Sequence, residues 1–459
     1  MLFRHLSTVF FIFFIKYDES DRFISIVFRK YICYNKSGQF INSFEYGENM
    51  LRIRKGINQD TIQEWNRSLL LKELRKKGIC SRAHLAKLSE LKQATVTNIM
   101  KDFIDWELVA ETGLLSGNKG RRSIGLTINR EKYRVFGLQI SRKFYKIGVF
   151  DLAGHQLDTV IKDIPKHPDV SSVLRNMCTV IHDFEKTYAG YSFLALGVAL
   201  PGPFISSKNR IALLVGGEEW AGINIKEALE KELDFPVFLE HDANAGAFTH
   251  MWRLKDAYQH QVLVYISVGP GIGAGIIMDN KIYTGALGIA GEIGHTSIDV
   301  NGRHCSCGNR GCLDLYASTT ALAEAVNAAY GRKGDGQLTL QDIRQMLQKK
   351  DEICLEHFTD VCRYIGYCIV NMINTINPDI IIIGDEISNM LPDLTQEIIH
   401  AVVKERILPE LHDSISITVS RDEDNVILTG AAIVAINAIF ENPETYMPKH
   451  RTDASGIHP

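Results

Sequence analysis

The 459-residue sequence is poor in cysteine and lacks a recognisable export signal. Its nine cysteines are too few for the disulfide framework of a small secreted protein, and six of them lie singly along the chain. This usage is typical of a reducing compartment, so we expect a cytoplasmic protein. The wholly apolar run Val9–Ile15 has only seven residues, whereas a membrane-spanning helix needs about 20. We therefore expect no membrane association.

The first 57 residues are interpreted as an N-terminal extension. The run Val9–Ile15 has the composition of a signal-peptide core, but no small-residue cleavage site follows it. The other interpretation is that Met50 is the true start and that residues 1–49 are upstream sequence, not translated in the native protein. We favour this second interpretation because export features are missing, and we assign no function to residues 1–57.

Length and charge indicate more than one domain. At about 150 residues per domain, the chain is long enough for roughly three units. The net charge of −3 hides an asymmetry, because residues 51–130 carry 16 Lys and Arg against 8 Asp and Glu, whereas residues 131–459 carry 29 against 41. A basic module joined to an acidic body indicates that the first part binds a polyanion. Chance segregation of charge is the simpler alternative.

Residues 58–128 have the pattern of a winged helix-turn-helix domain. Apolar spacing predicts a helix over residues 62–78, and Ser81 is a suitable N-cap for a short helix over 82–89. A tight turn then leads into a third helix over about 92–105. Two short helices joined by a tight turn, after a longer supporting helix, are the helix-turn-helix layout.

The third helix and the segment after it carry the residues expected to contact DNA. The outward helix face has short donors and acceptors suited to base edges in a major groove, namely Gln93, Thr95, Thr97, Asn98 and Lys101. Strand-like residues 108–111 and 124–128 flank a turn, which predicts a wing. Its basic tip, at Lys119, Arg121 and Arg122, is suited to phosphates or a minor groove. A plain three-helix bundle with a solvated polar face is the alternative.

After Asn129 the sequence alternates between strand-like and helix-like segments, as in an α/β domain. Strands are expected over residues 135–140, 145–150, 193–200, 237–239, 262–268, 276–278 and 380–383, and a final helix is expected to open at 429–432. Several strands run into segments typical of ligand loops, including Pro201-Gly202-Pro203 and the glycine-rich stretch 269–275. We therefore expect a ligand site at the strand ends.

Three of the cysteines are clustered near a histidine. His295, Cys305, Cys307 and Cys312 offer one imidazole and three thiolates, a soft tetrahedral set that suits a closed structural Zn²⁺ site. Intervening glycines let the backbone fold tightly around a small ion. A metal-free knuckle is one alternative; a disulfide is another, although a Cys-x-Cys pair is strained. The spacing predicts one structural zinc ion per chain.

The order of these motifs resembles the ROK family of repressors and sugar kinases. The resemblance covers residues 58–442 and rests on Pro201-Gly202-Pro203, His241-Asp242-Ala243-Asn244, Gly269–Gly275, Ala290–His295 and Cys305–Cys312. With the winged helix-turn-helix in front, it is closest to the branch of xylose repressors of Gram-positive bacteria. It implies a two-lobed actin/hexokinase-like domain over 130–442, a zinc knuckle at 295–312 that holds the sugar-binding loop, and a flexible tail over 443–459.

The same resemblance implies a sugar site. Its residues would be His241, Asp242, Asn244, Glu292, His295 and Asp314. Converging carboxylates and amides suit sugar hydroxyls, which both donate and accept hydrogen bonds. Asp242 stands where the kinases have their catalytic base, His241 replaces the usual Asn, and Asp314 replaces the usual Glu, which affects the choice of sugar. For any single carboxylate, a solvated loop residue is the alternative.

The phosphate-binding loop of a sugar kinase is altered here. The family pattern Asp-x-Gly-Gly-Thr corresponds to Gln139–Lys143, which lacks the Mg²⁺-side carboxylate and has bulky side chains in place of the glycines. The adenosine-side glycine pair is Gly384-Asp385. We therefore expect no enzyme and no catalytic residue. An ATP-dependent sugar kinase is the alternative, and a sugar-indifferent architectural DNA-binding protein is a third.

The predicted function is a sugar-responsive transcriptional repressor. A sugar inducer, xylose or a related monosaccharide, would bind the kinase-like domain and lower the affinity for a double-stranded DNA operator. Such coupling typically amounts to about 1–3 kcal/mol. The sugar would act by moving two DNA-binding modules out of register with each other, which affects binding only when two modules bind the DNA together. We therefore expect a homodimer or higher homo-oligomer on a pseudo-palindromic operator.

Overall fold

The computed structural model divides the chain into two compact units, residues 1–63 and 64–459. The described residues are 8–17, 24–34, 40–46, 59–115, 123–165, 167–202, 204–205, 210–211, 218–220, 222–254, 261–421 and 425–447. In the first unit, three strands pair in antiparallel order into a small sheet, for which the sequence carried no prediction. They are β1 (Thr8–Tyr17), β2 (Ile24–Tyr34) and β3 (Phe40–Tyr46).

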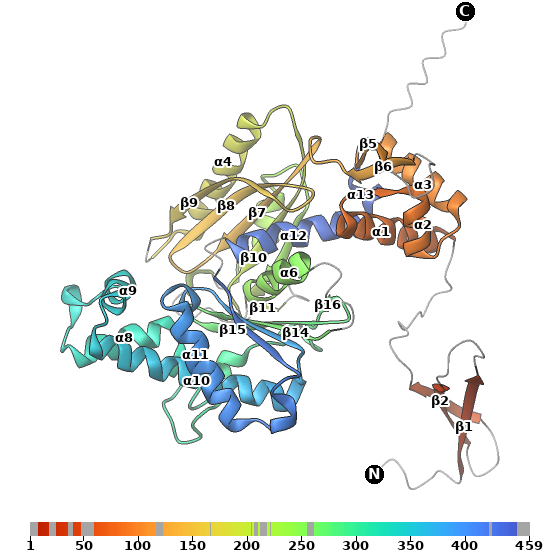
Figure 1. The fold of residues 1–459 in the computed structure, drawn as a ribbon. Coiled ribbons are helices and arrows are strands. Elements are labelled where there is room, and N and C mark those ends of the chain that lie inside the picture. The colour runs from red at the N-terminus through yellow and green to blue at the C-terminus, as the bar shows by residue number, and fades with distance from the viewer. Residues whose placement is uncertain are drawn as a thin grey trace, which may run out of the picture. The chain divides into compact units, whose positions relative to one another are not determined.

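The helix-turn-helix region contains the predicted helices and wing strands (Figure 1). They are α1 (Gln59–Lys77), β4 (Cys80–Ser81), α2 (Arg82–Ser89), α3 (Gln93–Asp105), β5 (Val109–Leu115) and β6 (Ser123–Ile128). The Ser81 hydroxyl accepts a hydrogen bond from the His84 amide at 3.3 Å and caps α2 as expected. Glu90 adopts a left-handed conformation, with a φ of 56°, and turns the chain from α2 toward α3.

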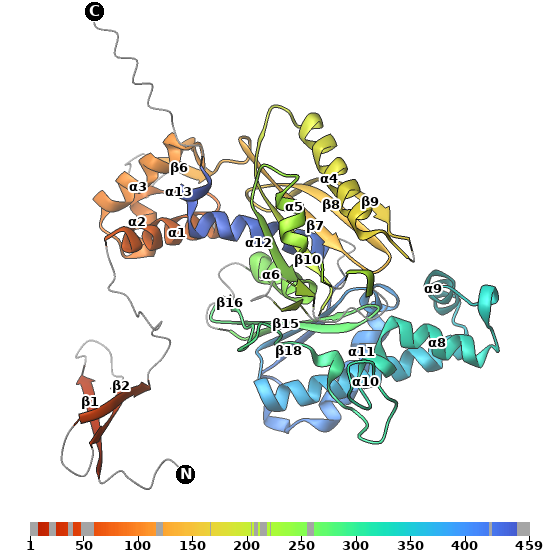
Figure 2. The same ribbon diagram turned by 180° about the vertical axis from the view of Figure 1, so that it is seen from behind.

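The body of the second unit has two lobes, each built on a five-stranded sheet. The first lobe contains β7 (Tyr133–Ile140), β8 (Phe144–Asp151), β9 (Gln156–Asp163), α4 (Val170–Thr187), β10 (Ser192–Leu200), α5 (Ile225–Glu230) and β13 (Val237–His241). Its strand order is β13-β10-β7-β8-β9, with β10 parallel to β7 and β13. Helices α4 and α5 pack their apolar residues against this sheet (Figure 2). The short pair β11 (Phe204–Ile205) and β12 (Arg210–Ile211) lies in the same part of the sequence.

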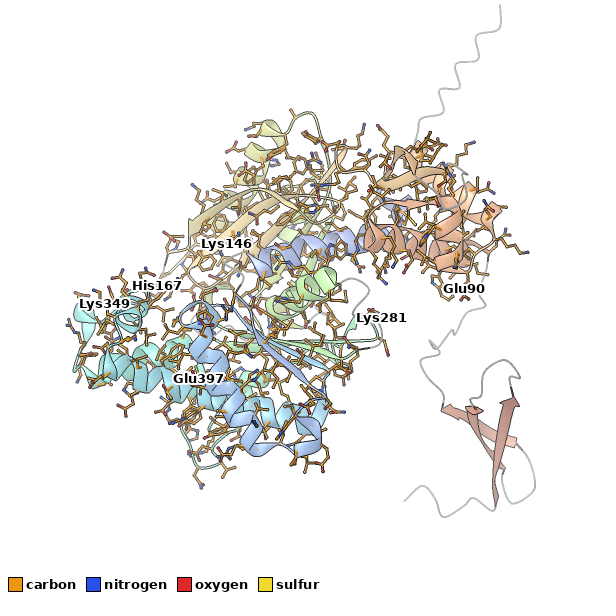
Figure 3. All side chains as sticks on the ribbon, viewed as in Figure 1. Glu90, Lys146, His167, Lys281, Lys349 and Glu397 are labelled. Carbon is orange, nitrogen blue, oxygen red and sulfur yellow. The ribbon has the colours of Figure 1, made fainter. Side chains whose placement is uncertain are left out.

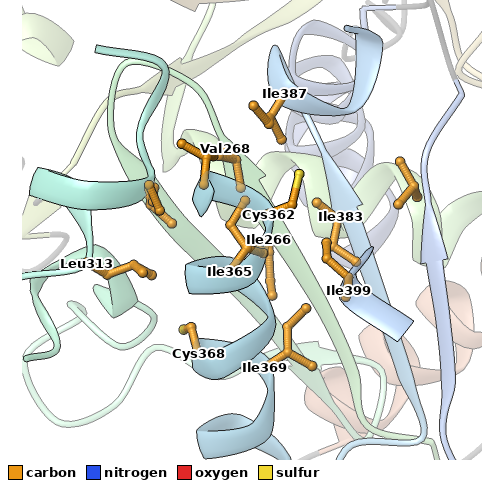
Figure 4. Close-up of a cluster of buried hydrophobic side chains, with 14 of the residues drawn as sticks. Ile266, Val268, Leu313, Cys362, Ile365, Cys368, Ile369, Ile383, Ile387 and Ile399 are labelled. Carbon is orange, nitrogen blue, oxygen red and sulfur yellow. The ribbon is translucent and has the colours of Figure 1, made fainter. Parts of the chain in front are cut away.

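The second lobe contains the sheet β16-β15-β14-β17-β18. Its elements are β14 (Leu263–Val268), β15 (Ile272–Met278), β16 (Lys281–Ile282), α7 (Asp314–Ala317), α8 (Thr319–Ala329), α9 (Leu340–Gln348), α10 (Glu352–Ile376), β17 (Ile380–Gly384), α11 (Pro392–Arg406) and β18 (Ser416–Val419). Ile266 and Ile383 on neighbouring strands pack against the Ile365 face of α10 (Figure 4). The α/β two-lobed architecture expected from the sequence is therefore confirmed.

Two helices, α6 (Asp242–Leu254) and α12 (Val426–Glu441), lie side by side between the two sheets (Figure 1). Glycines allow the close approach that this packing requires. A Cβ atom at Gly197 would lie 1.8 Å from the Ala431 carbonyl oxygen, and one at Gly430 would lie 1.8 Å from that of Ala245. A larger residue at Gly197 would push α12 away from β10, and a larger residue at Gly430 would push α12 away from α6.

Several boundaries differ from the sequence-based expectations, and three of them change how a segment is interpreted. The glycine-rich stretch 269–275 is mostly strand, because Ile272 already pairs with Val268 and only three residues form the turn. The final helix begins at Val426, three residues before the predicted opening. The predicted flexible tail begins with a helix, α13 (Pro443–Tyr446), while residues 448–459 lie outside the described chain.

The predicted domains 58–128 and 130–442 share a hydrophobic core. Leu70 and Leu71 of α1 belong to the same buried cluster as Ile439 and Phe440 of α12, and Met447 closes it. Sequence patterns did not indicate this shared core because they do not show contacts between residues hundreds of positions apart. None of the helices that the structure describes is both long and apolar enough to cross a bilayer.

Candidate ligand site and metal-binding cluster

A cavity of about 110 Å³ is lined by residues of both lobes. The first lobe contributes the turn between β7 and β8 and the end of β13, whereas the second contributes the turn between β14 and β15 and the segment 292–314. Five of the six predicted sugar-site residues line it, namely His241, Asp242, Glu292, His295 and Asp314. The cavity therefore brings together five predicted residues that lie up to 73 positions apart in the sequence.

Two of these residues occupy a strand-to-helix junction. His241 ends β13, and Asp242 begins α6 with its Oδ1 atom accepting a hydrogen bond from the Ala243 amide at 2.7 Å. A carboxylate in the first turn is favourable because it faces the positive end of the helix dipole. The Asp242 side chain keeps 27% of its surface exposed, so it remains accessible to a ligand in the cavity.

His241 lies between two carboxylates. Its Nε2 atom is 3.3 Å from Asp242 Oδ1 and 3.8 Å from Glu292 Oε1. Burial raises the pKa of Glu292, and the neighbouring His241 opposes this effect. Gly202 lies against the pair, and a Cβ atom there would come within 2.2 Å of His241 Nε2. The arrangement offers a ligand one imidazole ring and two carboxylate groups.

Asp314 starts the short helix α7 on the opposite side of the cavity. Its Oδ1 atom accepts a hydrogen bond from the Ile272 amide at 2.7 Å, which ties the carboxylate to the first residue of β15. Burial raises the pKa of this carboxyl group, and His295 opposes the rise. The backbone contact fixes one oxygen and leaves Oδ2 for other partners.

Asn244, the sixth predicted residue, does not line the cavity. Its side chain is buried and donates to Glu240 Oε1 at 2.9 Å. The reason is helical geometry, because residues two apart on a helix do not face the same side. Asn244 lies two positions after Asp242 on α6, so it turns away when Asp242 faces the ligand. The structure thus places Asn244 behind the cavity, where it braces the buried Glu240.

The sequence-based site omitted six polar residues that line the cavity: Gln139, Ser141, Arg142, Ser267, Asp385 and Glu386. Asp385 accepts a hydrogen bond from the Ser267 hydroxyl at 2.8 Å, and burial raises its pKa to about 7. A Cβ atom at Gly269 would lie only 2.6 Å from Asp385 Oδ2. The Asp385 carboxylate therefore occupies the space above the glycine-rich turn. The sequence did carry a signal for Asp385, because this residue directly follows Gly384 at the end of a strand.

The His295 and cysteine cluster forms a compact group of potential ligand atoms. One ligand atom from each of His295, Cys305, Cys307 and Cys312 lies within 4.8 Å of all the others. The Cys305 Sγ to His295 Nδ1 distance is 3.8 Å, and the Cys307 to Cys312 Sγ distance is 3.6 Å. Ligands of a tetrahedral metal bonded at roughly 2.0–2.3 Å have a similar mutual separation. These four residues fit a single metal ion.

Four of the five predicted base-contacting residues on α3 are exposed, and Thr95 is half-buried. The opposite face of α3 is buried at Val96, Ile99, Met100 and Phe103. The Thr97 hydroxyl donates to the Gln93 carbonyl oxygen at 2.8 Å, which leaves its lone pairs as acceptors. The predicted wing-tip residues Lys119, Arg121 and Arg122 lie outside the described residues.

Comparisons with known proteins agree with the geometry. A xylose repressor of Bacillus spizizenii is 30% identical over 391 residues, which cover 84% of this chain and 98% of that protein. A xylose repressor of Caldicellulosiruptor bescii is 28% identical over 403 residues, with 84% and 99% covered. The crystal structure of a ROK family transcriptional regulator, a homologue of the E. coli MLC protein, matches with a TM-score of 0.70 at 27% identity and covers 83% of this chain and 97% of its own. The ROK family model matches residues 135–438, about two thirds of the sequence, and the chain therefore belongs to the ROK family.

Proposed function

We propose that this protein is a transcriptional repressor whose ROK domain binds a monosaccharide inducer, xylose or a close relative. The observation that carries the proposal is the cavity in which His241, Asp242 and Glu292 converge, within the same compact unit as an exposed polar recognition helix. The similar proteins named xylose repressors support the same assignment. Two copies of the chain would bind two half-sites of a pseudo-palindromic operator.

Sugar recognition would depend on the carboxylates of the cavity. Glu292 and Asp242 would each accept a hydrogen bond from a sugar hydroxyl, and His241 between them would hold both carboxylates in place. Glu292 precedes the three-residue helix η4 (Ile293–His295), so the sugar site and the metal-binding cluster are joined by one short segment.

The metal would be a structural zinc ion, one per chain. A closed set of four protein ligands leaves no open position for a reactant. Coordination through His295 Nδ1, the atom nearest to Cys305, would leave Nε2 as a hydrogen-bond donor for the ligand cavity. Zinc would thus hold the 290–314 segment in the conformation that sugar binding needs.

Phosphorylation is the alternative function, and the loop that would hold ATP argues against it. Gln139, Ser141 and Arg142 line the cavity where the kinases of the family use an acidic, glycine-rich loop. The Asp385 carboxyl group beside Gly269 supplies no positive charge where an incoming phosphate would need positive partners.

Two experiments separate the functions. Selection from a random DNA duplex library with the purified protein should recover a pseudo-palindromic sequence, and a coupled ATP assay with D-xylose and D-glucose should show no sugar-dependent ADP release. Recovery of no preferred DNA sequence together with sugar-dependent ADP release would support the kinase and reject the repressor.

The basic wing tip gives a prediction about salt. Arg121→Ala combined with Arg122→Ala should weaken binding to every DNA sequence, because both guanidinium groups are expected to bind phosphates rather than bases. The slope of log affinity against log salt should fall by about 0.9 for each phosphate that is no longer neutralised. Fluorescence anisotropy at several salt concentrations measures this slope. The control is the double variant Arg332→Ala with Lys333→Ala, which removes two exposed cations in the second lobe. Equal slopes in the two double variants would show that Arg121 and Arg122 do not bind phosphates.

Two helices join the cavity to the helix-turn-helix region. Helix α6 begins at Asp242 in the cavity and carries Trp252 near its other end. The Arg75 guanidinium of α1 stacks on the Trp252 ring at 3.7 Å and donates to the Trp252 carbonyl oxygen at 3.2 Å. Helix α12 has Ile427 at the cavity and Phe440 in the core shared with α1. Movement of either helix on sugar binding would reach α1.

Trp252→Phe is therefore expected to uncouple the two sites. The smaller ring stacks less extensively on Arg75 and cannot form the indole hydrogen bond to the Ala153 carbonyl oxygen. The variant should bind sugar and operator separately, while the sugar-induced change in operator affinity falls at least threefold. Trp65→Phe is the control, because Trp65 on α1 keeps 47% of its surface exposed. An unchanged sugar effect in Trp252→Phe would show that coupling takes another route.

A further inference from the structure

Arg142 lies at the tip of a braced turn that faces the cavity. The turn joins β7 to β8, and the Ser141 hydroxyl accepts hydrogen bonds from the Lys143 and Phe144 amides, each at 3.3 Å. The Ile164 amide donates to the Lys143 carbonyl oxygen at 2.7 Å and supports the turn from the side. These contacts hold the turn rigidly, so the half-buried Arg142 side chain is presented to the ligand space from the first lobe.

Asp314 meets Arg142 from the second lobe, over Gly271. A Cβ atom at Gly271 would lie 3.8 Å from Arg142 Nη2 and 3.7 Å from Asp314 Oδ2. The two charged groups thus converge on one point. Within the described part of the chain, they form no ion pair with each other, and the Arg142 guanidinium has no hydrogen bond. A gap remains between a donor and an acceptor in the cavity wall.

The chemistry of the gap selects its occupant. An anion placed there would be repelled by Asp314, and a cation would be repelled by Arg142. A hydroxyl group suits both partners, since it accepts a hydrogen bond from the guanidinium and donates one to the carboxylate. Such a hydroxyl would bridge Arg142 of the first lobe and Asp314 of the second lobe.

We propose that Arg142 and Asp314 hold one hydroxyl of the inducer between them, above Gly271, and that this shared contact draws the two lobes together. The inference rests on the proposed function, since it takes a monosaccharide as the ligand. It adds Arg142, a residue of the loop that differs from the kinases, as a direct inducer contact. Loss of the kinase loop and gain of a sensor residue would then be the same change in sequence.

Gly271→Ala tests the gap itself. Gly271 is not in the left-handed region, and the added methyl would meet the two side-chain atoms at ordinary contact distances, so the fold should tolerate it. The methyl would occupy the position of the hydroxyl. By calorimetry, the variant should bind D-xylose at least tenfold more weakly than wild type. Gly336→Ala, where an added Cβ meets nothing within 4 Å, is the matched control.

Arg142→Met identifies the hydroxyl. Wild type and variant are titrated with D-xylose and with its monodeoxy analogues. We expect the variant to bind D-xylose at least tenfold more weakly than wild type. For the one analogue that lacks the shared hydroxyl, we expect the two proteins to have the same affinity, because that analogue has no hydroxyl for Arg142 to bind. Equal affinities of Gly271→Ala and wild type, or the same ratio of affinities for every analogue, would overturn this inference alone. Binding of neither D-xylose nor D-glucose to wild type would overturn the proposed function as well.

Discussion

Glu292→Ala is expected to bind D-xylose roughly 5- to 150-fold more weakly than wild type while its affinity for operator DNA without sugar stays the same. Glu292 lies in the cavity within 3.8 Å of His241 Nε2, and its carboxylate is mostly buried. Removing it leaves a sugar hydroxyl without an acceptor in a desolvated pocket, at a cost of about 1–3 kcal/mol. Since about 1.4 kcal/mol corresponds to a tenfold change in affinity, the variant should repress and resist induction.

Calorimetry with D-xylose and anisotropy with operator DNA measure the two affinities. Asp242→Ala should behave in the same way, because its carboxylate faces the same cavity. Glu405→Ala removes an exposed carboxylate on α11 and serves as the control. Identical sugar affinities in wild type, Glu292→Ala and Asp242→Ala would show that this cavity is not the sensor.

Cys307→Ala is expected to lose the metal and, with it, most sugar binding. A site of four protein ligands tolerates the loss of one thiolate poorly. The segment that carries Glu292 and Asp314 would then lose the cross-link between His295 and the three cysteines. Metal analysis of the purified wild type should give about one zinc per chain, whereas the variant should give close to none. Operator binding should persist in part, since α3 lies outside this segment.

Cys178→Ala provides the control for a removed thiol, because Cys178 is buried against the first lobe and lies outside the cluster. It should retain both zinc and sugar binding. Freshly purified wild type without zinc, or a Cys307→Ala variant that retains its zinc, would contradict the structural role of the cluster.

Local sequence signals predicted elements whose causes are local. Ser81 caps α2 as its position before an apolar repeat indicated. The three cysteines and His295 come together because only 17 residues separate the first from the last of them, and glycines such as Gly308, with a φ of 94°, let the chain turn tightly. The resemblance to family motifs identified five residues that line the cavity. It also suggested Asn244, whose position on α6 turns its side chain away from the cavity toward Glu240.

Features that depend on contacts between distant parts of the chain could not be predicted from local sequence signals. Arg142 and Asp314 converge over Gly271 only because two lobes from separate parts of the chain face each other. Likewise, α13 looked like a polar tail, yet Glu444 forms an ion pair with Arg67, which also contacts Asp102 of α3. Side chains on different elements form these contacts, and no spacing within one segment encodes them. Another such case is Lys146 on β8, which is labelled in Figure 3. Its ammonium group donates a hydrogen bond to Asn425 Oδ1 at 2.9 Å, just before α12.

The most direct test of sugar-responsive repression is the affinity of the wild-type protein for its selected operator with and without sugar. Fluorescence anisotropy of a labelled duplex, titrated with protein in the presence of D-xylose, D-glucose or buffer alone, gives this affinity. Coupling of about 1–3 kcal/mol predicts a roughly 5- to 150-fold loss of operator affinity with the inducing sugar. The same affinity with every sugar, under conditions where calorimetry shows that one of them binds, would contradict a sugar-responsive repressor.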